Sequence, residues 1–184
     1  MVETCVISGY EPRMAFRHFL AGIKCRRKLS HRQLAFRSGV DHSTLSRLAR
    51  SDREASLEVF SRIVDSLELS DELTYALTLG GLPKGTGSGK RAVNNDSAPV
   101  LEGSLGQQLK GYMEQRGVSQ RALEAKIKAT FPDATLDHSA ISRIISNERY
   151  PLLSSFALIT YSLGLNPAQV RGLVRTAGNR PQLV

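Results

Sequence analysis

One pattern of hydrogen-bonding side chains occurs twice in this sequence. The segment DHSTLSRL at residues 41–48 returns as DHSAISRI at residues 137–144, a spacing of 96 residues (137 − 41). On a helix that begins after the aspartate, the apolar positions share one face, and the His, Ser and Arg side chains project from the other. Arginine and histidine donate hydrogen bonds, and serine both donates and accepts them. The pattern predicts two outward-facing polar sets: His42, Ser43, Ser46 and Arg47, and His138, Ser139, Ser142 and Arg143.

The charge of the chain favours a polyanionic partner. The 184 residues include 25 Lys and Arg against 17 Asp and Glu, which gives a formal net charge of +8. Cutting the chain after Val93 leaves 15 basic and 10 acidic residues before the cut, and 10 and 7 after it. Each half is therefore mildly basic, which is not the pattern of a neutral domain with a basic tail.

The repeat extends well beyond the polar segment. At the same spacing of 96, five apolar residues after it are identical in the two copies, and Arg53 corresponds to Arg149. Before the polar segment the spacing is 89, so the second copy carries seven additional residues, 129–135. Because polar positions repeat as well as apolar ones, we interpret the chain as two copies of one unit. The identical apolar pairs are Leu57/Leu153, Phe60/Phe156, Ile63/Ile159, Leu67/Leu163 and Leu69/Leu165.

Each copy predicts five short helices. The first carries apolar residues at three- and four-residue steps over 16–23 in one copy and 105–113 in the other. Ser30 with Gln33 forms a capping-box pattern, so the second helix should begin at His31 and end near Gly39. Asp41 and Asp137 are suited to cap the third helices. A fourth follows from the repeated apolar stripe, and the fifth helices should follow Ser70 and begin at Asn166-Pro167, the latter ending before Gly178.

The segment between the copies is rich in Gly, Pro, Ser, Asn and Lys, which predicts a flexible linker with a typical span of about 25–30 Å. We expect an N-terminal tail over 1–12, with a short extended stretch over 4–8. A first domain follows over 13–80, then the linker over 81–103, a second domain over 104–178 and a C-terminal tail over 179–184.

Residues 29–48, LSHRQLAFRSGVDHSTLSRL, resemble the Cro and phage-repressor type of helix-turn-helix, the XRE family. Residues 118–144 are similar, and NERYP at 147–151 looks like the turn that follows the family's recognition helix. The resemblance covers about four fifths of the chain. It implies an all-α fold of two lambda-repressor-like five-helix bundles, and it implies a DNA-binding transcriptional regulator whose partner is double-stranded DNA.

The resemblance also implies roles for individual residues. The two polar sets lie at or beside base-contacting positions, where arginine can bind guanine O6 and N7 together. His31 and Gln120 begin the helices whose N-termini hold phosphate in this family. Further phosphate candidates are Arg32, Arg50, Arg53, Arg121 and Arg149. The basic cluster Lys24, Arg26, Arg27 and Lys28 is another, although basic residues also suit a helix C-terminus without any DNA.

The sequence departs from the family pattern at several positions. Ala49 and Ser51 replace the usual Glu and Gly around the end of the first recognition helix. Glu124 replaces the small residue that lets the second and third helices pack closely, where the first copy has Ala35. The insertion over 129–135 lengthens the second copy's turn. If one copy has lost DNA binding, we expect it to be the second.

Other classes of function find little support in the residues. Gly85–Lys90 lacks the first glycine and the final Ser or Thr of a phosphate-binding loop. The four histidines show no metal spacing, and no catalytic triad or carboxylate pair is evident, so we expect neither an enzyme nor a cofactor. Cys5 and Cys25 suggest free thiols, and no apolar run reaches membrane-spanning length, so the expectation is a cytoplasmic protein, on the nucleoid when bound to DNA. A homodimer is compatible with the sequence. The alternative function is a protein-interaction or self-association module of the antitoxin or anti-repressor type.

Overall fold

The computed structural model describes residues 16, 18–20, 28–50, 52–80, 82 and 101–178, and helices dominate this part of the chain. The tails, the extended stretch expected over 4–8, both cysteines, Lys24, Arg26, Arg27 and most of the linker lie outside the described residues. The helices are α2 (His31–Ser38), α3 (His42–Ala49), α4 (Leu57–Ser66), α5 (Asp71–Leu79), α6 (Leu105–Gln115), α7 (Gln120–Thr130), α8 (His138–Ile145), α9 (Leu153–Leu163) and α10 (Pro167–Gly178). Within the described residues, none of the helices is long and apolar enough to cross a bilayer.

The predicted helix boundaries are confirmed at the caps. At the start of α2, Ser30 Oγ accepts a hydrogen bond from the Gln33 backbone, and Gln33 Oε1 accepts one from the Ser30 N–H at 2.8 Å. Gly39 ends the helix with φ 62°, a left-handed conformation that glycine adopts without strain. Asn166 and Gln169 exchange the equivalent pair of hydrogen bonds at the start of α10. This helix includes Gly178, so it ends one residue later than the sequence predicted.

The core follows the repeated apolar stripe. Leu57, Phe60 and Ile63 of α4 are fully buried, and their equivalents in α9 are fully buried or nearly so. Burial of such side chains is the main favourable term in folding, worth roughly 1.5–3 kcal/mol for each large one. The same repeat positions therefore form the core of each half, as the sequence repeat predicts.

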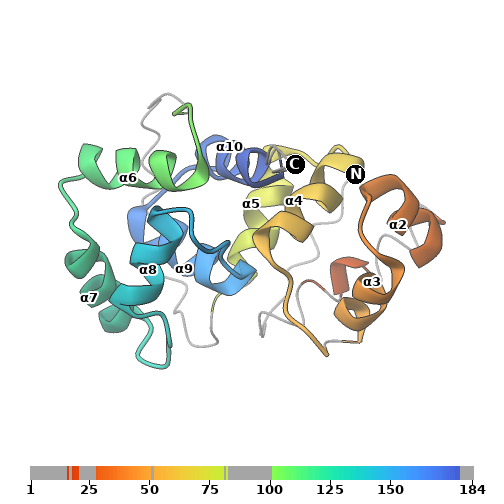
Figure 1. Ribbon diagram of the computed structural model, residues 1–184, viewed down its shortest axis with the longest axis horizontal. Helices are drawn as coiled ribbons and strands as arrows, with labels where there is room; N and C mark the ends of the chain where they lie inside the picture. Colours follow the sequence, from red (N-terminus) through yellow and green to blue (C-terminus); the bar gives the residue numbers. More distant parts are fainter. Residues whose placement is uncertain are drawn as a thin grey trace, which may run out of the picture.

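Four helices lie at the centre of the molecule, as Figure 1 shows: α4 and α5 from the N-terminal half, and α9 and α10 from the C-terminal half. Helix α10 packs on both α4 and α5, and α9 packs on α5 and α4. Helices α2 and α3 lie at one end of the molecule, and α7 and α8 lie at the other. The composition of the linker gave no indication that the two halves contact each other.

The insertion in the C-terminal half extends the core. Helix α7 has 11 residues where α2 has 8, and the segment after it buries the side chains of Phe131 and Leu136. The Phe131 ring meets Tyr161 of α9 edge to face, with ring centroids 5.3 Å apart. The insertion therefore adds a packed segment beside α9 rather than an exposed loop alone.

Replacing Phe131 with Ala should lower the free energy of unfolding by about 3–5 kcal/mol, because a buried ring is lost and a cavity is left beside α9. Chemical denaturation followed by circular dichroism measures the change. Thr135→Ala, an exposed position in the same insertion, is the matched control and should leave stability nearly unchanged. Equal stability of the two variants would mean that the insertion is not part of the core.

Candidate nucleic-acid interface

Helix α3 presents the first polar set to solvent. Leu45 and Leu48 are buried with Val40 beneath them, so the opposite face of the helix points outward. His42, Ser43 and Arg47 are exposed, and Ser46 is half-buried. Asp41 caps the helix: its carboxylate accepts hydrogen bonds from the Ser43 backbone and, at 2.6 Å, from the Ser43 hydroxyl.

Helix α8 has the same construction with small differences. Ile141 and Ile144 are buried, while Ser139 and Arg143 are exposed and His138 and Ser142 are half-buried. Asp137 caps the helix by accepting a hydrogen bond from the Ala140 backbone at 2.7 Å. The partial burial of His138 leaves less of its ring available than that of His42.

Neither Arg47 nor Arg143 is neutralised by a carboxylate in the described segments. Across residues 28–50, 52–80 and 101–178, no ion pair forms at Arg47 or Arg143. The turn after each helix is also alike: the carbonyl of Arg47 accepts from the Asp52 N–H at 3.0 Å, and that of Arg143 accepts from the Glu148 N–H at 3.0 Å. Arg47 and Arg143 are thus held in equivalent backbone settings, and no described carboxylate pairs with either guanidinium group.

The phosphate candidates lie on the surface around these helices. His31 and Gln120 are the first residues of α2 and α7, and both are half-buried. Lys28, the described member of the basic cluster, is exposed with φ 51°. The remaining candidates, all exposed, are Arg32, Arg50, Arg53, Arg121 and Arg149. No group of His, Cys, Asp or Glu in the described segments is arranged to hold a metal ion.

The sequence analysis expected Glu124 to impair the packing of α7 on α8. Its side chain instead pairs with a lysine of the same helix. Its carboxylate accepts from Lys128 Nζ at 2.6 Å, and this contact raises the pKa of Lys128. Helix α7 still packs on α8, as α2 packs on α3. The departure from the family pattern is therefore accommodated without separating the two helices.

Sequence reasoning missed a pair of hydrogen bonds that ties the turn after α8 to α6. Asn147, at φ 60° in the turn after α8, accepts from the Gly106 N–H at 2.9 Å and donates to Ser104 Oγ at 3.0 Å. At Gly106 a Cβ atom would lie 2.0 Å from the Ile145 carbonyl oxygen, so only glycine permits this approach of α6 to α8. The available signal was an asparagine in a turn, a residue that tolerates the left-handed conformation.

The comparison with known families agrees with this geometry. Residues 23–73 match the family model described as helix-turn-helix. The match identifies a helix-turn-helix domain of the XRE type within this part of the chain. That family suggests a DNA-binding regulator, and its members are generally not enzymes. No curated protein and no solved structure shows significant similarity to the chain.

The cap of the helix-turn-helix domain gives a pH-dependent prediction. Hydrogen bonds donated by the Ser43 side chain and backbone lower the pKa of Asp41. A lowered pKa contributes stability above the unfolded value of about 3.9, and that stability is lost as pH falls through the folded value. Asp41→Ala should therefore lower the melting temperature by about 3 °C at pH 7.

The difference between Asp41→Ala and the unmutated chain should shrink as the pH falls below about 4, because the carboxylate becomes protonated there. Thermal melts followed by circular dichroism from pH 7 to pH 2.5 give the comparison. Asp133→Ala, an exposed acid away from any helix cap, serves as control. A difference that persists unchanged at pH 2.5 would contradict a charge-dependent cap.

Proposed function

We propose that this chain is a sequence-specific regulator of transcription that places α3, and also α8, in the major groove of double-stranded DNA. The observation that carries the proposal is the pair Arg47 and Arg143, exposed and without an acidic partner in the described segments. An arginine held as an internal structural cation would be expected to meet a carboxylate. Two arginines kept open at the same position of two helices suit an external acceptor.

The chemistry of α3 favours guanine in the contacted sequence. Arg47 can donate two parallel hydrogen bonds to guanine O6 and N7, and His42 can donate to the same acceptors. The Ser43 hydroxyl donates a hydrogen bond to the Asp41 carboxylate, so its oxygen is left to accept from an adenine or cytosine amino group. The helix therefore offers arginine and histidine as donors and serine as an acceptor.

Backbone contacts would set the register of the domain on the duplex. The helix dipole favours a phosphate at the N-terminus of α2, which begins at His31. Arg32 lies in its first turn, while Arg50 and Arg53 follow α3, so exposed positive charge lies on both sides of the recognition helix. Such contacts position the protein without selecting a sequence.

We also propose that the C-terminal half is a second helix-turn-helix module. Support comes from α8, which has the same aspartate cap, the same buried face and the same turn hydrogen bond as α3. Close packing of α7 on α8 despite Glu124 adds to it. The partial burial of His138 makes Arg143 the main base-contacting residue of this half.

One observation favours protein binding as a second candidate function. Phe36 of α2 is 90% exposed, and its ring is costly to leave in water. If this ring contacts a partner protein, Phe36→Ser should impair regulation in cells while DNA affinity stays unchanged. Loss of DNA affinity in this variant would instead place the ring at the duplex.

Arg47→Ala should lower the affinity for a duplex selected from a random library by about 10- to 100-fold, because a bidentate base contact is lost. Arg143→Ala should do the same to a lesser extent. Fluorescence anisotropy with labelled duplex measures both. Arg175→Ala removes an exposed arginine of α10, outside α3 and α8, and should have little effect. If all three variants bind alike, α3 does not read the duplex.

The salt dependence of binding tests the phosphate contacts separately. If each half neutralises about four phosphates, log K should fall against log salt concentration with a slope of about −7. Titrations at several potassium chloride concentrations give the slope. Arg53→Ala should make it shallower by about one unit and weaken all duplexes equally. A slope near zero would rule out DNA binding of this kind.

A further inference from the structure

The two halves join through residues that are equivalent in the repeat. Ser56 and Leu152, which are 96 residues apart, form an antiparallel bridge. The Leu57 N–H donates to the Pro151 carbonyl at 2.9 Å, and the Leu153 N–H donates to the Ala55 carbonyl at 2.9 Å. Each hydrogen bond maps onto the other when the halves are exchanged. An antiparallel bridge between equivalent residues has a local two-fold axis, so the halves meet here as two subunits of a symmetric dimer do.

This local axis stands at the same chain distance from both recognition helices. Helix α3 ends at Ala49, seven residues before Ser56, and α8 ends at Ile145, seven residues before Leu152. Seven residues span at most about 25 Å and the bridged residues lie about 4.5 Å apart, so the helix ends lie within about 55 Å of one another. Two half-sites on one face of a duplex are about 34 Å apart, which falls inside that limit.

The contact between the halves is a packed one. Helix α9 is buried along most of its length, which is expected of a helix between its own bundle and the opposite half. Gly178 of α10 lies so close to α4 that a Cβ atom there would be 2.4 Å from Ser61 Oγ. The Ser154 N–H donates to Glu54 Oε1 at 2.7 Å across the halves. These contacts, rather than the linker, fix the relative position of the halves.

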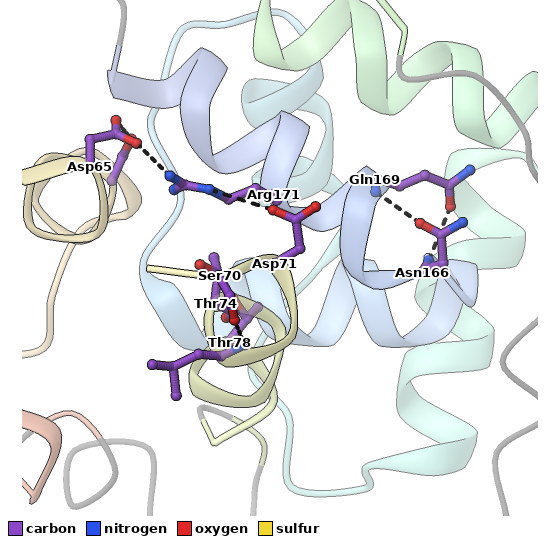
Figure 2. Close-up of polar contacts among 10 residues, drawn as sticks. Asp65, Ser70, Asp71, Thr74, Thr78, Asn166, Gln169 and Arg171 are labelled. Carbon is purple, nitrogen blue, oxygen red and sulfur yellow. Dashed lines mark hydrogen bonds and ion pairs between the residues drawn. The ribbon is translucent and has the colours of Figure 1, made fainter. Parts of the chain in front are cut away.

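A buried arginine makes the contact specific for unlike halves. Arg171 of α10, whose side chain is 6% exposed, lies between two carboxylates of the N-terminal half (Figure 2). Its Nη2 is 3.0 Å from Asp65 Oδ1, and its Nε is 3.9 Å from Asp71 Oδ1. The repeat places Tyr75 where Arg171 would recur and Tyr161 where Asp65 would recur. The ion pairs are therefore present once, on one side of the axis.

This asymmetry disfavours pairing between identical halves of two chains. Two C-terminal halves would bury Arg171 opposite Tyr161, and a buried guanidinium without a carboxylate is strongly unfavourable. Two N-terminal halves would bring Asp65 opposite Tyr75 with no cation to meet it. One half of each kind satisfies the charges, and a single chain supplies one of each.

We propose that the chain is an internal dimer that binds, as one molecule, a bipartite duplex site with two unlike half-sites. The inference rests on the proposed function for its DNA component. The half-sites differ because the surfaces that meet them differ: Ser43 is tied to its Asp41 cap while no described residue hydrogen bonds to the Ser139 hydroxyl, and Thr44 is replaced by Ala140. A perfect palindrome is therefore not the preferred sequence.

A disulfide across the bridge tests the pairing without DNA. Ser56 and Leu152 form the non-hydrogen-bonded pair of the bridge, where side chains approach most closely. In a Cys5→Ser/Cys25→Ser background, Ser56→Cys with Leu152→Cys should oxidise to a disulfide within one chain, seen as a faster-moving monomer on a non-reducing gel. Each single cysteine variant is the matched control. Covalent dimers in the double variant, or no disulfide, would overturn the internal pairing.

DNA binding by the oxidised double variant tests whether one chain binds two unlike half-sites. The probe is the duplex selected by the unmutated chain from a random library. We expect one chain per duplex by analytical ultracentrifugation, a footprint over two dissimilar segments, unchanged affinity after oxidation, and at least a tenfold loss when five base pairs are inserted between the segments. Two chains on a palindrome would overturn the internal dimer while leaving the proposed function intact. Failure to select any duplex, with the disulfide formed, would refute the proposed function and leave only the pairing.

Discussion

The burial of two apolar residues one turn apart determines what α3 can do. Leu45 and Leu48 occupy the interior of the bundle, and the period of 3.6 residues then leaves Arg47 no direction but outward. The Asp41 cap starts α3 at His42. The left-handed conformation of Gly39 ends α2 and allows the turn by which α2 packs on α3. A change in the phase of the apolar stripe by one residue would rotate the arginine by about 100° and remove the surface proposed for DNA.

The sequence predicted the local structure well because local rules determine it. The Ser30–Gln33 box, the two aspartate caps and the repeated apolar stripe each depend on residues within one or two turns, and all are present as expected. The outward direction of Arg47 and Arg143 followed from the same periodicity. The effect of Glu124 was misjudged because the side chain has a partner, Lys128, four residues along the same helix.

Contacts between segments that are distant in the sequence could not be predicted from apolar periodicity and helix propensity. Nothing around Arg171 marks it as buried, since its partners Asp65 and Asp71 are about 100 residues away and belong to the other half. The hydrogen bond between Gly106 and Asn147 joins α6 to the turn after α8 in the same way. The composition of the linker predicted flexibility and gave no sign that the halves pack together, whereas α10 packs on α4 and α5.

The solitary Arg171 has a consequence for how such a chain can evolve. A duplicated unit begins as two interchangeable copies, each able to associate with itself. Under the proposed duplication, the copy with the buried cation and the copy with the anions each suit the other better than a copy of their own kind. Under the proposed pairing, separation of the two coding segments would leave Arg171 in one protein and its two carboxylates in another, which favours keeping both halves in one chain.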